Sequence, residues 1–213
     1  MEVLAPMAVS EVDYTRAAAE ATIEKVGAAL TANNIEATVV QDGAEARARI
    51  LEIIPVGAEV YTAKSKTVQD IGLFEELNDP GKYDAVRPKY MAMDRATQGN
   101  EIRRLMASPD YIVGSVQALT EDGTLVAVSY SGGQLGAYVA GAGRVLLVVG
   151  SQKIVPDFEA AMTRIEEHVF PYEDNLLKSQ FGVPTKTAKV LQIHLEARPG
   201  RTTVFLVREP VGV

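Results

Sequence analysis

The chain has 213 residues, 47% hydrophobic and 23% charged, a composition typical of one well-buried α/β domain with a modest extension. Its formal net charge of -7 excludes the broad basic face that sequence-independent nucleic-acid binding requires, so we expect no nucleic-acid partner. The absence of cysteine excludes disulfides, thiolate nucleophiles and cysteine-held zinc or iron–sulfur sites.

The N-terminal sequence carries no targeting pattern. The stretch MEVLAPMAVSEVDY lacks the basic region and the long apolar region of a secretory signal. No window approaches the roughly 18 uninterrupted apolar residues of a membrane span. We therefore expect a cytoplasmic protein with no membrane contact.

The first half of the chain alternates between helical and strand-like patterns. Apolar residues at helical spacing predict a helix over 11–33, with Ser10 and Asp13 as a capping signal near its start. Similar patterns predict, in chain order, a strand over Glu36–Val40, a helix over 43–53, a strand over Ala58–Tyr61, a helix that begins at Thr67, and a helix over about 93–107.

The second half begins with four closely spaced β-type runs, YIVGSV, TLVAVSY, LGAYVA and RVLLVVG. Val145–Val149 is continuously apolar and bounded by glycines, which predicts a strand buried on both faces of a parallel sheet. A helix is predicted over 156–169. Alternating apolar residues at 191–195 and the run TTVFLV at 202–207 predict a terminal hairpin.

These elements predict an α/β fold with a single mixed or mostly parallel sheet flanked by helices. No internal repeat and no low-complexity linker interrupts the chain. We expect an N-terminal helical segment at 1–35, an α/β core at 36–171, and a C-terminal extension at 172–213 that packs on the same domain.

Several familiar functional motifs are incomplete in this sequence. The stretch GAGRVL at 141–146 lacks the third glycine of a dinucleotide fingerprint and enters a strand. Lys64 and Ser65 resemble the end of a Walker loop, but its glycines are absent. With only His168 and His194 in the chain, we expect no metal site and no catalytic triad. His168 is interpreted as a solvated residue near a helix C-terminus, and His194 as solvent-facing on a strand.

Three loops that follow β-type runs remain candidates, because open parallel sheets bind ligands at the carboxyl ends of their strands. In the first, TAKSKT at 62–67, Lys64, Ser65 and Thr67 could converge on a phosphate or carboxylate. The alternative interpretation is that Thr67 merely caps a helix and the lysines are solvated. Sequence alone favours neither.

The second loop is TEDG at 120–123. Glu121 and Asp122 are candidate catalytic residues, because a partly buried carboxylate has a raised pKa that suits general acid or base chemistry. Gly123 would then contribute to ligand binding. The alternative, which is somewhat favoured, is a hairpin turn built by Asp122 and Gly123.

The third loop, GSQK at 150–153, ends at Lys153, which follows the buried strand and could present a cation to a ligand, although a solvated lysine is common there. A further candidate segment is SYSGGQ at 129–134. Its Gly132, Gly133 and Gln134 offer amides to a ligand, although two glycines between strands usually form a simple turn.

With these residues considered together, the chain resembles the LUD-domain family, the lactate-utilisation proteins of the C-subunit type. The resemblance is carried by IPVGAEVYTAKSKTVQDIG at 54–72, DYIVGSVQALTEDGTLV at 110–126 and VLLVVGSQKIVPDFEAAMTRI at 145–165. It implies a fold similar to ribose-5-phosphate isomerase, glucosamine-6-phosphate deaminase and CoA-transferase domains. It also implies a role in oxidising L-lactate to pyruvate.

The resemblance assigns places to two of the loops. Ser65 and Thr67 would lie at the sugar-phosphate loop of the related isomerases, and Glu121, Asp122 and Gly123 would line the facing side of the cleft. The chain departs from many members in having Gly132-Gly133-Gln134 in place of Gly-Asn-Arg, and in lacking a cysteine-containing C-terminal segment.

Three hypotheses follow. In the leading one, the protein binds a small anionic metabolite and supports lactate oxidation with separate iron–sulfur redox subunits, and no cofactor is assigned to the chain itself. In the second, it is a stand-alone isomerase, transferase or folate-processing enzyme with Glu121 as base or nucleophile. In the third, it is a non-catalytic regulatory or assembly module that uses the C-terminal hairpin and the exposed apolar surface to pair with another chain or with itself as a homo-oligomer.

Overall fold

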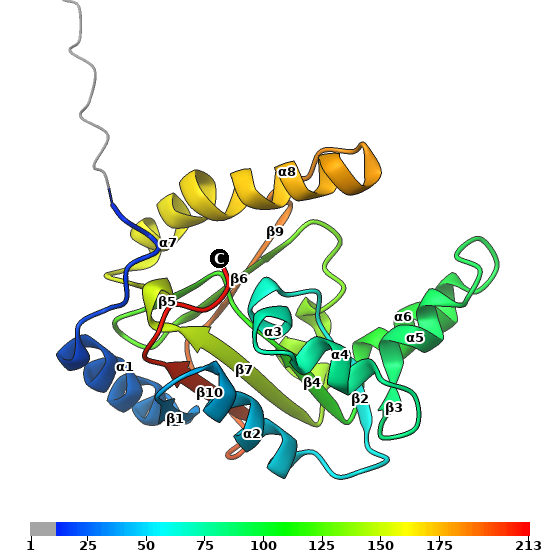
Figure 1. The fold of residues 1–213 in the computed structure, drawn as a ribbon, viewed down its shortest axis with the longest axis horizontal. Helices are drawn as coiled ribbons and strands as arrows, with labels where there is room; N and C mark the ends of the chain where they lie inside the picture. Colours follow the sequence, from blue (N-terminus) through cyan, green and yellow to red (C-terminus); the bar gives the residue numbers. More distant parts are fainter. Residues whose placement is uncertain (1–11) are drawn as a thin grey trace, which may run out of the picture.

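The structure, a computed structural model, describes residues 12–213 and confirms an α/β fold with a mostly parallel sheet flanked by helices (Figure 1). The larger sheet has six parallel strands. In spatial order they are β1 (Glu36–Val40), β10 (Thr202–Val207), β7 (Arg144–Gly150), β4 (Tyr111–Gly114), β2 (Glu59–Thr62) and β3 (Asp84–Ala85).

A second sheet of four strands accompanies the first. Its spatial order is β8 (Ile154–Val155), β5 (Ala118–Thr120), β6 (Leu125–Ser129) and β9 (Lys189–Ile193). Here β6 is antiparallel to both β5 and β9, whereas β8 runs parallel to β5. The prediction of one sheet is therefore corrected to two, because β5 and β6 turn back on each other instead of extending the parallel order.

The helical elements follow in chain order: α1 (Glu20–Ala32), α2 (Gly43–Ile53), α3 (Lys66–Asp70), α4 (Leu73–Asn78), α5 (Val86–Met91), α6 (Gly99–Ala107), the π-helical turn η1 (Ala137–Gly141), the 3₁₀ turn η2 (Ser151–Lys153), α7 (Phe158–Arg164), the π-helical turn η3 (Ile165–Val169) and α8 (Phe170–Phe181). Within residues 12–213, none of them is both long enough and apolar enough to cross a membrane.

Both faces of the six-stranded sheet are buried, as the apolar run of β7 predicted. Val145, Leu147 and Val149 pack in the core that α1 covers, together with side chains of the second sheet. Leu146 and Val148 pack in the core on the opposite face, with α2, α3 and α4. Alternate residues of a strand point to opposite faces, so a strand buried on both sides must be apolar throughout.

The prediction of a terminal hairpin is wrong. β9 pairs with β6 in the second sheet, whereas β10 lies between β1 and β7 in the first. All six residues of β10 are buried, because it is an interior strand covered on both faces. The third hypothesis thereby loses the hairpin, one of the two surfaces that it proposed.

Several predicted helix boundaries also change. Helix α1 begins at Glu20, while Asp13 accepts hydrogen bonds from Thr15 in a local turn and Ser10 lies outside the described residues. The helix expected after Thr67 is two short helices, because Gly72 between them has a positive φ of 72°. The helix expected over 156–169 continues as α7, η3 and α8, so His168 is not at a helix C-terminus.

The run LGAYVA was predicted as β-type but forms the helical turn η1. Helix ends leave carbonyl groups without partners inside the helix. The buried Arg201 supplies further partners at η1, since its guanidinium donates to the carbonyl oxygens of Ala137, Tyr138 and Ala142 at 2.8, 3.0 and 3.1 Å. The same guanidinium forms a 2.9 Å ion pair with the buried Glu196.

We expect Gly141→Ala to destabilise the protein by at least about 2 kcal/mol, because a Cβ at this position would overlap the carbonyl oxygen of Ala107. Gly136 in the same helical segment is the matched control, since its φ is -61° and no atom lies within 4 Å of an added Cβ. Gly136→Ala should raise the free energy of unfolding by about 0.5–1 kcal/mol. Urea unfolding measures both, and equal effects of the two variants would contradict the packing described here.

Candidate functional site

Three loops meet at the carboxyl edge of the six-stranded sheet, where β2, β4 and β7 end. The side chain of Lys153, in the turn after β7, joins them. Its Nζ donates to Thr67 Oγ1 at 2.8 Å, to Ser115 Oγ at 3.1 Å and to the carbonyl oxygen of Val116 at 3.4 Å. Parallel strands end at one edge, so residues far apart in sequence are brought together there.

Lys153 is only 2% exposed and forms no ion pair within residues 12–213. Burial, followed by the nearby positive charge of Arg164, lowers the pKa of its ammonium to about 7, against a smaller opposing effect of Asp70. Burial without a negative partner favours the neutral form of a lysine, even though hydroxyl and carbonyl oxygens accept its hydrogen bonds. Its charged form would be favoured by an anion.

A second buried cation lies close to the first. Arg164, at the end of α7, is fully buried and donates from Nη1 to the carbonyl oxygen of Gln117 at 2.6 Å. Its Nε and Nη2 have no hydrogen-bond partner among the described residues. The ring of Tyr14 lies 5.9 Å from the guanidinium carbon and gives a cation–π contact. Such a charge is costly to bury without a negative partner.

A small cavity of about 40 Å³, here called the inner cavity, opens beside Lys153. It is mainly polar. Its lining includes Lys64, Ser65, Lys66, Thr67, Ser115, Gln117, Gln134, Lys153 and Glu173. The inner cavity therefore combines several cations with hydroxyl and amide groups, a set that suits a carboxylate or phosphate.

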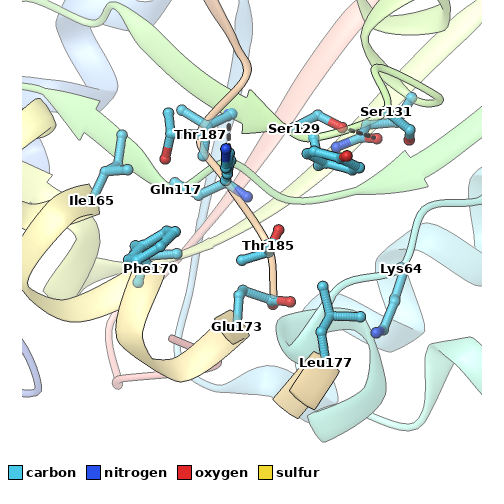
Figure 2. A pocket seen from close by; sticks show the side chains of 15 residues that line it. Lys64, Gln117, Ser129, Ser131, Ile165, Phe170, Glu173, Leu177, Thr185 and Thr187 are labelled. Atoms are coloured by element: carbon cyan, nitrogen blue, oxygen red, sulfur yellow. Dashed lines mark hydrogen bonds between the residues drawn. The ribbon is translucent and has the colours of Figure 1, made fainter. Parts of the chain in front are cut away.

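A larger cavity of about 280 Å³, here called the outer cavity, adjoins the inner one and shares Lys64, Gln117, Gln134, Val169 and Glu173 with it. Figure 2 shows Ile165 and Phe170 on one side of it and Ser129 and Ser131 on the other. Helix α8 contributes Phe170, Glu173 and Leu177 to its wall.

The TAKSKT loop both lines the cavities and caps a helix, the two roles that the sequence left open. The helix cap is Ser65, whose Oγ accepts from the backbone N–H of Val68 at 3.4 Å, so the interpretation of Thr67 as the cap is wrong. Thr67 is buried and instead accepts the hydrogen bond from Lys153. Lys64 lines both cavities and lowers the pKa of Glu173, although burial of that carboxyl raises its pKa overall.

Of the SGGQ residues, Gln134 lines both cavities. Its Oε1 accepts from Ser129 Oγ at 3.3 Å. Gly132 has a positive φ of 84° and donates its N–H to Ser129 Oγ at 2.9 Å, so it shapes the turn that positions Gln134. Neither Gly132 nor Gly133 lines the two cavities.

The TEDG residues are not brought to these cavities, which corrects their expected place on the facing side of the cleft. Glu121 pairs with Lys25 of α1 at 2.6 Å. Asp122 accepts from Thr120 and from the N–H of Thr124, and these hydrogen bonds hold its pKa below its usual value. Gly123, with a φ of 86°, completes the turn between β5 and β6 against α1. A catalytic role for Glu121 and Asp122 stays a prediction without support from this geometry.

Four residues of the site were not predicted from the sequence: Ser115, Gln117, Arg164 and Glu173. Ser115 and Gln117 follow β4 as Lys153 follows β7, so the same positional rule could have found them. Arg164 lies beside Ile165 on the buried face of its helix. A charged residue on such a face is rare and could have indicated a functional site. Glu173 lies beyond the point where the predicted helix ended.

Comparisons with known proteins gave a match to a family model and a similar solved structure. A family model described as LUD domain matches residues 23–207. Among solved structures, the chain is similar to a DUF162 family protein from Deinococcus radiodurans, with 12% sequence identity and a TM-score of 0.48, over 88% of this chain and 96% of that chain. No curated protein matches the chain.

Proposed function

The chain belongs to the LUD-domain family, which is associated with lactate utilisation, and we propose that it binds a small anionic metabolite in the inner cavity. In this proposal the protein is cytoplasmic and supports the oxidation of L-lactate to pyruvate with separate redox subunits. One observation carries the binding proposal: Lys153 and Arg164 are both buried, the charge of Arg164 lowers the pKa of Lys153, and neither forms an ion pair with any described residue.

An anion would compensate both cations. Lys153 reaches the inner cavity directly, while Arg164 adds positive potential from behind it. In a low-dielectric interior an unpaired charge is unfavourable, and a negative ligand group removes most of that cost. The charged and titratable groups around Lys153 include Lys64 and Lys66 from the TAKSKT loop, Asp70 from α3, Tyr138 from η1, Arg164 from α7, His168 from η3 and Glu173 from α8, and the last residue, Val213, lines the same cavity.

Separate redox subunits are proposed because oxidation of lactate to pyruvate removes two electrons. The sequence contains no cysteine, so it cannot hold a cysteine-ligated iron–sulfur cluster. An iron–sulfur partner would supply that function. The alternative of a stand-alone enzyme using Glu121 gains no support, because Glu121 is paired with Lys25 away from both cavities.

Calorimetric titration with L-lactate, pyruvate and inorganic phosphate tests the binding proposal. We expect saturable binding at about pH 6 that weakens by up to about tenfold per pH unit above about pH 7, because the anion requires protonated Lys153. Binding should also take up protons, which titrations in buffers of different ionisation enthalpy reveal. Lactate and pyruvate stay ionised throughout, so they report the protein group and not their own titration.

His168 does not produce the same signature. Burial, followed by the charges of Arg164 and Lys153, lowers its pKa below its ordinary value, so it titrates at lower pH. Saturable binding with no pH dependence between about 6 and 9 would show that Lys153 is not the anion's partner. Absence of binding by all three probes at pH 6 would refute the proposal.

A further inference from the structure

A ligand of the size of lactate, bound in the inner cavity, would leave the outer cavity unfilled. Its volume is about 280 Å³ against about 40 Å³ for the inner cavity. The two cavities adjoin, since Lys64, Gln117, Gln134, Val169 and Glu173 line both. A ligand whose anionic group lies beside Lys153 would therefore project the rest of its structure into the outer cavity.

The wall of the outer cavity is apolar where such a projection would lie. Val128 of β6, Ile165 and Val169 of η3, and Phe170 and Leu177 of α8 form it. Figure 2 shows Leu177 and Lys64 at one end of the cavity and Phe170 further along the same helix. At the rim, the ring of Tyr130 is 60% exposed. Apolar side chains left open in a concave site gain most from an apolar ligand.

On the premise of the proposed function, we propose that the site takes an anion with an apolar body larger than the skeleton of lactate. The carboxylate or phosphate head lies at Lys153, and the body packs between β6 and α8. The class includes acids with an aryl or long alkyl side chain and apolar phosphate monoesters. Each buried methylene should tighten binding by about fourfold, because apolar surface is removed from water.

Four probes separate the head from the body: pyruvate, phenylpyruvate, inorganic phosphate and phenyl phosphate. We expect each phenyl compound to bind at least tenfold more tightly than the short anion with the same head. The pair that shows the greater affinity identifies the head. Binding is measured by calorimetry with the full chain at about pH 6, where Lys153 is protonated.

Two neighbouring leucines provide a matched pair of variants. Leu177 and Leu176 lie side by side on α8 and are both partly buried, but only Leu177 lines the outer cavity. Leu177→Ser should reduce the affinity for the phenyl compounds by about three- to tenfold and leave that for the short anions unchanged. Leu176→Ser has the same helix propensity cost and should change neither.

The outcomes distinguish the two proposals. If the short anions bind with the expected pH dependence and the phenyl compounds bind no more tightly, the larger ligand is refuted and the anion site stands. If the phenyl gain is the same in Leu177→Ser as in the wild type, the body does not lie in the outer cavity and the inference fails. If none of the four probes binds, both proposals fail together.

Discussion

Lys153→Met should weaken the binding of lactate and pyruvate by about 10- to 100-fold at pH 6, the loss expected for one hydrogen bond to a charged group. Methionine nearly fills the space of the lysine stem but cannot donate a proton or carry charge. The buried position makes the effect large, since water cannot replace the missing ammonium. Calorimetric titration of the wild type and the variant measures it.

The same substitution should raise the stability of the folded protein at pH 6. In the unfolded chain a lysine holds its proton up to about pH 10.4, whereas folded Lys153 releases it at about 7. Between these values the unfolded state binds more protons, so stability from this group rises with pH, by up to about 1.4 kcal/mol per pH unit. The free energy of unfolding of Lys153→Met should therefore exceed that of the wild type most at low pH, and the difference should shrink as pH rises.

The control is Lys178→Met, which removes an exposed lysine from an ion pair with Asp174 on α8. It should change stability by less than about 0.5 kcal/mol, and without a trend over this pH range. Urea unfolding at several pH values gives both comparisons. A variant at Lys153 that binds lactate as tightly as the wild type would show that the buried ammonium does not contact the anion.

Arg201→Met should destabilise the protein by about 3–5 kcal/mol, the range seen when one partner of a buried ion pair is removed. The guanidinium is 4% exposed, and its loss removes a donor from the carbonyl groups of Ala137, Tyr138 and Ala142, of which Ala137 keeps the N–H of Ala142. It also leaves the Glu196 carboxylate buried without a cation. Burial raises the pKa of Glu196, but hydrogen bonds from Arg198, Thr202 and Arg201 outweigh burial and lower it.

Adding Glu196→Gln to Arg201→Met should restore part of this stability, because the uncompensated negative charge is then removed. The matched control is Arg198→Met, since Arg198 is exposed and contacts Glu196 only through its backbone N–H. That control should stay within about 0.5 kcal/mol of the wild type. A loss below about 1 kcal/mol in Arg201→Met would mean that other groups hold η1 in place.

Patterns local in sequence predicted much of the fold. The apolar run of β7 indicated a strand covered on both faces, and β1 occurs with the predicted bounds. The position of Lys153 after that strand led to the side chain that joins three loops. These successes share a cause, because burial on two faces and placement at a strand end are both written in a few consecutive residues.

The errors arose where distant residues decide the local structure. β9 and β10 each read as a strand, but their partners are chosen by the packing of two different sheets. LGAYVA has residues that favour a strand, yet Arg201 stabilises its helical form from a distant segment. Likewise, TEDG follows a strand as TAKSKT does, but its strand belongs to the second sheet, so the loop lies elsewhere. Sequence spacing alone carries no signal for these choices.

The place of β10 has a consequence for the order of folding. The paired residues Glu36 and Thr203 of β1 and β10 are 167 positions apart, and β10 is the one sheet neighbour of β1 in the described chain. During synthesis β1 therefore stays unpaired until nearly the whole remaining domain has been made. Contacts at such separation slow folding, and the open edge of β7 is exposed to wrong partners until β10 closes the gap.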